Sequence, residues 1–219
     1  MSISYKLRRN KYGDYRDQLQ ELVDFNPGQI SFEEYCYMFQ MIANKSGSNF
    51  LVFGLGKDSH MWMKCNQGGK TVFLEHDPAW IELAKQQIPG VDVRLTNYTG
   101  NGHDAIKLLE DYKKGDNDLN LELDDDIRNT EWDFILVDAP TGYHPNKPNR
   151  MKSIYESFNL SNNSKSIDIF VHDCGREIED TYTKYFFKDF DFIKEIDDNK
   201  HGVLRHYKKR GKNENKTSK

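Results

Sequence analysis

Residues 49–62 read NFLVFGLGKDSHMW, and the fold is decided by this stretch. Its apolar run, residues 50–53, predicts a buried strand that stops at Gly54 and Gly56. Because glycine has no side chain, it lets the backbone approach a ligand closely. The pattern therefore predicts a strand that ends in a ligand-binding turn.

A helix is expected directly after the two glycines, with Asp58 or Ser59 as its cap. The first N–H groups of a helix have no partner within the helix, so they can bind a ligand. Strand, glycine turn and helix start together predict a cradle for a nucleotide-type ligand.

Strands and helices are expected to alternate through the rest of the chain. Further buried strands are predicted at residues 71–74, 91–95, 131–138 and 168–171, and helices at 78–87, 103–112, 152–158 and 178–187. Such alternation is typical of a parallel sheet covered on both faces. The last two apolar runs, 190–196 and 203–207, predict an antiparallel hairpin. The expected fold class is α/β, with a mostly parallel sheet and a C-terminal hairpin.

The 219 residues are expected to form one domain with flanking segments. We assign residues 1–28 to an N-terminal arm with a short helix, 29–207 to the domain, and 208–219 to a basic disordered tail. Within the domain, Ser31 and Glu34 predict a capping box. The acidic residues 115–129 are expected to form a solvated surface insertion.

Composition excludes several classes of protein. The net charge of −4 argues against a nucleic-acid partner. The three cysteines, Cys36, Cys65 and Cys174, form no CxxC pair and predict free thiols rather than a zinc site or disulfides. No stretch has the roughly 18 apolar residues of a membrane span, and the N-terminus lacks a signal-peptide core. We expect a cytoplasmic protein.

Polar residues stand where the predicted parallel strands end, which is where open α/β sheets bind ligands. Glu75 and His76 follow the second strand, Asp138 the fourth, and His172 and Asp173 the fifth. An acid that ends the second strand about 20 residues after the glycines typically binds ribose hydroxyls. Glu75 therefore predicts a cofactor that contains adenosine.

The glycine pattern favours S-adenosylmethionine over NAD. A dinucleotide site prefers a third glycine, where this chain has Ser59. S-adenosylmethionine has no pyrophosphate, and its sulfonium cation suits a neighbouring carboxylate such as Asp138. An NAD-dependent oxidoreductase stays open as an alternative.

Several sequence blocks resemble the plant glucuronoxylan 4-O-methyltransferase family, which includes the irregular-xylem proteins. The blocks are FLVFGLGKDSHMW, GGKTVFLEHDPAWI, WDFILVDAPTGYHPNKPNRM, DIFVHDCGREIEDTY and GVLRHY. The resemblance implies a Rossmann-like methyltransferase fold and methyl transfer from S-adenosylmethionine to a sugar hydroxyl of a glycan. Its motif positions fall on Gly54, Gly56, Ser59, Glu75, Asp138, Gly142, Tyr143, His144, His172, Asp173, Arg176 and Glu177.

Methyl transfer to a hydroxyl needs a base that takes the proton. The candidate bases are Asp138, Asp173, His172 and His144. A divalent metal held by Asp138 and Asp173 is a second way to activate the hydroxyl.

Other residues are expected to hold the two ligands. We expect Gly54, Gly56, Ser59, Glu75, His76 and Asp138 to bind the cofactor, and Tyr143, Arg176 and Glu177 to bind the sugar. Arg150 is left open between a substrate contact and a helix-surface charge. A non-enzymatic methyltransferase-like protein in glycan assembly is the remaining alternative.

Overall fold

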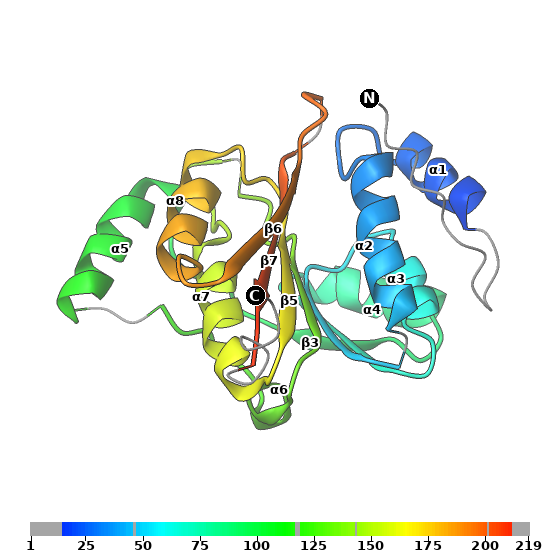
Figure 1. Cartoon of the computed structure of the whole chain (residues 1–219), viewed down its shortest axis with the longest axis horizontal. Coiled ribbons are helices and arrows are strands. Elements are labelled where there is room, and N and C mark those ends of the chain that lie inside the picture. The colour runs from blue at the N-terminus through cyan, green and yellow to red at the C-terminus, as the bar shows by residue number, and fades with distance from the viewer. Residues whose placement is uncertain (1–14, 46, 117–118, 143, 201, 212–219) are drawn as a thin grey trace, which may run out of the picture.

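The computed structural model describes residues 15–45, 47–116, 119–142, 144–200 and 202–211 (Figure 1). Its centre is a seven-stranded sheet with the order β3-β2-β1-β4-β5-β7-β6. The strands are β1 (Asn49–Phe53), β2 (Lys70–Glu75), β3 (Asp92–Leu95), β4 (Phe134–Val137), β5 (Ile167–Val171), β6 (Asp191–Ile196) and β7 (Leu204–Lys209). This confirms the mostly parallel α/β sheet and the C-terminal hairpin.

The strand order reverses between β1 and β4, which is the topological switch point of the sheet. From β3 through β5 all neighbouring strands are parallel, with Phe53 beside Leu74 on one side and Val137 on the other. Their carboxyl ends therefore lie along one edge. Only β7 and β6 run antiparallel to their neighbours.

Helices cover both faces of the sheet. Figure 1 shows α1 (Arg16–Phe25), α2 (Phe32–Asn44), α3 (Ser59–Cys65) and α4 (Pro78–Gln87) on one face. The opposite face carries α5 (Ala105–Lys114), α7 (Met151–Leu160) and α8 (Glu177–Phe186), while α6 (Asp125–Asn129) lies at one end of the sheet.

The alternation of side chains along the strands explains the two layers. Leu51 and Phe53 of β1 belong to the apolar cluster under α7 and α8, whereas Phe50 and Val52 belong to the cluster under α1 to α4. All four are almost completely buried. A strand that is buried on both faces needs the continuous apolar run that the sequence shows.

Two peripheral segments contribute side chains to the core. Helix α1 matches the short helix predicted within residues 1–28, and its Leu19 and Leu22 are buried in the core cluster with α2. The acidic segment 115–129 is not simply solvated, contrary to expectation. Its apolar side chains Leu119, Leu121 and Ile127 are buried in the other cluster, while its described acids face outward.

Three further expectations concern the cysteines, the membrane and the tail. Cys36, Cys65 and Cys174 are buried and form no disulfide within the described residues. Within the described ranges, no helix combines the length and the apolar character needed to cross a membrane. Strand β7 extends two residues beyond the expected domain end, and the predicted disordered tail lies outside the described residues from 212 onward.

Candidate active site

A cleft opens at the switch point, above the carboxyl ends of β1, β2 and β4. We call it the cofactor cleft. Its walls combine the glycine turn, the end of β2 and the segment after β4. The polar or turn-forming residues that line it are Gln29, Gly54, Gly56, Asp58, Glu75, His76, Asp138 and Thr141.

Gly54 is required by the close approach of two backbones. Its φ is 121°, and a Cβ atom there would lie 3.2 Å from the Cβ of Ala139. A side chain at this position would be strained and would collide with the segment after β4. The glycine at the end of β1 is thus fixed by the sheet geometry of the switch point.

The N–H groups of the glycine turn are already engaged, contrary to the expectation of an open cradle. The N–H of Gly54 donates to Leu74 O at 2.9 Å, that of Leu55 to Glu75 Oε2 at 3.2 Å, and that of Gly56 to Ser59 Oγ at 3.0 Å. Ser59 is buried inside the turn. It shapes the turn and does not line the cofactor cleft, unlike its expected role.

Glu75 and His76 lie where a ribose-binding pair was expected. Glu75 Oε1 accepts from the N–H of His76 at 2.7 Å and of Asp77 at 3.0 Å, so the buried carboxylate is held firmly. His76 Nδ1 lies 2.7 Å from the same oxygen, and its ring is half exposed at the rim. Both residues line the cofactor cleft.

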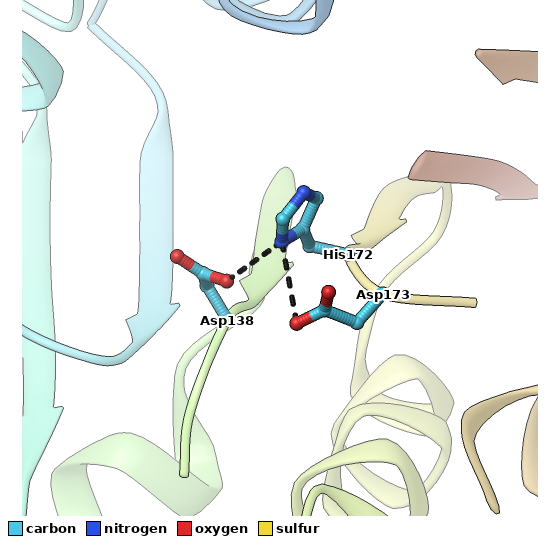
Figure 2. Close-up of side chains that lie close together, drawn as sticks. All are labelled: Asp138, His172 and Asp173. Carbon is cyan, nitrogen blue, oxygen red and sulfur yellow. Dashed lines mark hydrogen bonds and ion pairs between the residues drawn. The ribbon is translucent and has the colours of Figure 1, made fainter. Parts of the chain in front are cut away.

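Asp138, His172 and Asp173 form a cluster where β4 and β5 end (Figure 2). His172 Nδ1 lies 3.1 Å from Asp138 Oδ1 and 3.6 Å from Asp173 Oδ2. Asp173 has a φ of 64°, a conformation that is rare for residues other than glycine and often found at functional sites. The parallel pairing of β4 with β5 brings these side chains together, as the strand ends predicted.

Arg150 holds the cluster from behind. Its guanidinium is 3.0 Å from Asp138 Oδ1 and 2.7 Å from Asp173 Oδ2. It also donates to the backbone oxygens of Pro140, His172 and Asp138. With only 4% of its side chain exposed, Arg150 is neither a helix-surface charge nor an accessible substrate contact.

The charges in this cluster shift the pKa values of its side chains. Burial would lower the pKa of His172, but the neighbouring carboxylates of Asp138, Asp173 and Glu34 raise it well above its ordinary value. Burial would raise the pKa of Asp173, but His172 and Arg150 hold it well below its usual range. This direction favours the imidazolium form of His172, which makes His172 a poorer base than the carboxylates of the cluster.

Asp138, His172 and Asp173 bring ligand atoms within 4.8 Å of one another, close enough to hold a metal ion, but the cations beside them oppose one. Both carboxylates already face the guanidinium of Arg150 and the imidazolium of His172. A metal between them would stand beside two fixed positive charges, and its His172 ligand would have to be deprotonated. Arg150 and His172 thus provide the positive charge that a metal ion would otherwise place beside the two carboxylates.

The expected sugar-binding residues are spread along the far side of the cluster. Arg176 lies 3.0 Å from Asp173 Oδ1 and donates to Thr141 O at 2.9 Å. Glu177 is exposed at the start of α8, and His144 is exposed in the loop after β4, where its Nδ1 accepts from the N–H of Asn146. Tyr143 lies outside the described residues.

Helix α2 contributes residues that the sequence analysis did not assign to the site. Glu34 is 1% exposed, and its Oε1 lies 3.7 Å from His172 Nε2. Tyr35 donates to Asp58 Oδ2 at 3.3 Å. The capping box revealed Glu34 as a helix residue, but nothing local in the sequence signals that α2 lies beside β5.

The chain matches a known protein family over most of its length. The family model described as IRX15/IRX15L/GXM matches residues 33–207. The chain belongs to this family. The match begins at α2 and ends inside β7, so it includes the residues that line the cofactor cleft except Gln29.

Curated members of the IRX15/IRX15L/GXM family are similar over most of this chain. Glucuronoxylan 4-O-methyltransferase 3 of Arabidopsis thaliana is 37% identical over 82% of this chain and 63% of its own length. Arabinogalactan O-methyltransferase 2 of the same plant is 36% identical over 80% of this chain and 68% of its own length. The chain thus spans about two thirds of the length of these relatives.

Solved structures confirm the fold. A putative caffeoyl-CoA O-methyltransferase from Staphylococcus aureus aligns with a TM-score of 0.52 over 90% of this chain and 93% of its own, at 15% identity. A putative type 11 methyltransferase from Sulfolobus solfataricus aligns with a TM-score of 0.51 over 85% of this chain and 95% of its own, at 11% identity. The chain has the Rossmann-like fold of S-adenosylmethionine-dependent methyltransferases.

Proposed function

We propose that this protein is an O-methyltransferase that transfers a methyl group from S-adenosylmethionine to a sugar hydroxyl of a glycan. The observation that carries the proposal is Asp138, a carboxylate held at the switch point between the cofactor cleft and the His172–Asp173 pair. The names of the relatives, O-methyltransferases of glucuronoxylan and arabinogalactan, support a glycan as the methyl acceptor.

The residues of the cofactor cleft fit S-adenosylmethionine. When bound, this cofactor supplies an electrophilic methyl group on a sulfonium centre. Gly54 and Gly56 leave room beside the backbone, and the fixed carboxylate of Glu75 accepts from ribose hydroxyls, with His76 at the rim.

Asp138 is the better of the two candidate carboxylate bases. The contacts of Asp138 with Arg150 and His172 use Oδ1, and Figure 2 shows its second oxygen pointing away from His172. Asp173 has both oxygens engaged, Oδ2 with Arg150 and Oδ1 with Arg176. A base needs an uncommitted lone pair within reach of the hydroxyl, so Asp138 Oδ2 takes the proton. Arg150 and His172 orient this carboxylate.

The acceptor sugar occupies a second cleft beyond Asp173. This acceptor cleft is lined by Gly28, Asp173, Gly175, Arg176, Lys200, Gly202 and Val203. Arg176 offers donors for sugar hydroxyls there. The contribution of Glu177, His144 and Tyr143 to sugar binding stays a prediction.

A methyl-transfer assay with isotopically labelled S-adenosylmethionine tests the proposal. The acceptors are glucuronoxylan, arabinogalactan and an uncharged glucan, and each reaction is run with and without a chelator. We expect transfer to a glycan that the chelator leaves unchanged, because Arg150 and His172 oppose a metal ion at the site. Asp138→Asn should lower turnover about 10²- to 10⁴-fold through loss of the base, whereas Asp125→Asn on the exposed α6 should not.

Two results would contradict this assignment. Cofactor binding limited to NAD would favour the oxidoreductase alternative. Binding of S-adenosylmethionine without transfer to any glycan would favour the non-enzymatic alternative. The cytoplasmic location and the absence of a nucleic-acid partner stay predictions from the sequence.

A further inference from the structure

Besides Glu75 and Asp138, a third carboxylate lines the cofactor cleft, and it forms no ion pair within the described residues. Asp58 lies in the turn between β1 and α3 and lines the cofactor cleft. It also lines the adjoining hollow under residues 26–30 and Tyr35. Within the ranges that the structure describes, no lysine, arginine or histidine forms an ion pair with Asp58. Asp138 differs in this respect, because it has Arg150 and His172.

Neutral donors hold one oxygen of Asp58 and leave the other directed toward the glycine turn. Trp62 Nε1 donates to Oδ2 at 2.9 Å, and the hydroxyl of Tyr35 donates to the same atom at 3.3 Å. Oδ1 lies on the side of Gly56, 2.5 Å from the position that a Cβ atom there would occupy. The carboxylate is therefore fixed in place, with Oδ1 toward the turn that a ligand must approach.

The electrostatic environment shows that this charge is uncompensated. Burial and the neighbouring charge of Asp138 raise the pKa of Asp58 to about 6. A paired carboxylate would show the opposite direction, as Asp173 does. A cation brought by a ligand would relieve this repulsion.

The N–H groups of the turn cannot replace this carboxylate for a cation, because a cationic group needs hydrogen-bond acceptors. Two carbonyl oxygens of the turn already accept within the chain, Leu55 O from Trp80 Nε1 and Gly56 O from the N–H of Ser59. Among the other carboxylates that line the cofactor cleft, Glu75 is assigned to the ribose and Asp138 Oδ2 to the acceptor hydroxyl. Asp58 Oδ1 is the acceptor left for a positively charged hydrogen-bond donor.

We infer that Asp58 binds the α-ammonium group of the methionine part of S-adenosylmethionine. An ammonium group has three N–H donors and a full charge, so it fits an oxygen that needs both. A sulfonium centre has no N–H and cannot donate to Oδ1. The inference rests on the proposed function, since it names how the same cleft holds its cofactor.

Calorimetric titration of three ligands tests the inference without measuring catalysis. S-adenosylmethionine and its demethylated product, S-adenosylhomocysteine, both have the ammonium group. Methylthioadenosine keeps the adenosine but has neither the ammonium nor the sulfonium charge. Asp58→Asn keeps the size of the side chain and removes its charge.

We expect Asp58→Asn to weaken both ammonium ligands to a similar degree, by about tenfold to a hundredfold, and to leave methylthioadenosine unchanged. Asp125→Asn is the charge-matched control on exposed α6 and should bind all three ligands normally. Tyr35→Phe keeps the carboxylate and should retain most of the affinity. The melting temperature of each unliganded variant shows whether it folds.

Several outcomes would overturn the inference. Unchanged binding by Asp58→Asn would show that the ammonium lies elsewhere. Weakening of S-adenosylmethionine alone would place the sulfonium there instead. Equal loss of methylthioadenosine, or equal loss in Tyr35→Phe, would assign Asp58 a structural role. If the unaltered protein bound none of the three ligands, the proposed function itself would fail, and the inference with it.

Discussion

Arg150 shows how one buried side chain can organise a site made from two strand ends. It joins Asp138, which follows β4, to Asp173, which follows β5. Because both carboxylates share its guanidinium, they stay close together without a metal ion. Removal of this cation would leave two carboxylates facing each other beside His172.

Substitution of Arg150 by glutamine should be strongly destabilising. Breaking a buried ion pair by removing one partner typically costs about 3–5 kcal/mol. Arg94→Gln is a matched control, since Arg94 also pairs with acids but at the surface. Exposed pairs contribute only about 0–1 kcal/mol. Denaturant unfolding of the two variants measures the difference, and an Arg150→Gln protein as stable as Arg94→Gln would contradict this account.

The acids of the site could be predicted from the sequence, whereas their partners could not. Glu75, Asp138 and Asp173 directly follow apolar runs, and parallel strands bring such ends together. Arg150 and Glu34 reach the same place from a loop and from a helix on the opposite face. Their positions depend on how elements pack, which no local pattern encodes.

Helix α2 has a second role besides covering the sheet. Its capping box was predicted correctly, with Ser31 N–H donating to Glu34 Oε2 at 2.6 Å. The other oxygen of Glu34 has no hydrogen-bond donor and faces His172 Nε2. The helix thereby places a negative charge behind the imidazolium.

Glu34→Gln should lower the pKa of His172, because it keeps the helix cap and removes that charge. NMR titration of the His172 ring measures the shift. Ser31→Ala is the control, since it removes the cap and should cost about 1 kcal/mol of stability without moving the pKa of His172. An unchanged pKa in Glu34→Gln would show that Glu34 acts only as a cap.

The acidic segment shows where composition misleads at the scale of an element. Its many acids indicated a solvated insertion, but Leu121 is anchored by its N–H to Glu156 Oε1 at 2.5 Å. Leu119, Leu121 and Ile127 enter the core between the acids. The spacing of these few apolar residues indicates a segment that packs on the core, whereas the high charge of the segment indicated a solvated one.

At the scale of the whole molecule, the charged cluster couples global stability to pH. The pKa of His172 is higher in the folded than in the unfolded chain. Its charge therefore contributes stability that is full below about pH 6.5 and is lost as the pH rises through the higher folded pKa. His172→Gln should differ most from the unaltered protein below that pH and least at alkaline pH.

Denaturant unfolding at a series of pH values checks this dependence. Asp173 has the opposite shift, so its contribution is present above about pH 4 and is lost only at lower pH. The unaltered protein and His172→Gln are therefore compared between about pH 4, where the contribution of Asp173 is still present, and about pH 9. A difference between His172→Gln and the unaltered protein that grew with pH would contradict the assigned imidazolium.

The fold as a whole was predictable because its central strands β1, β4 and β5 are apolar on both faces, which makes each one recognisable by itself. The order of those strands was not predicted, since it depends on which helices cover which face. The switch point between β1 and β4 follows from that order, and the cofactor cleft follows from the switch point.

Helix α2 is needed for the site although it is not needed for the strands of the sheet. A chain trimmed to begin at Ser48 would keep every strand in Figure 1 and every glycine of the turn. It would nevertheless lose Tyr35 from the hollow beside the cofactor cleft and Glu34 from its place next to His172. The sheet and the complete site thus need different lengths of chain. The sheet needs only residues after Ser48, whereas the site also needs side chains of α2.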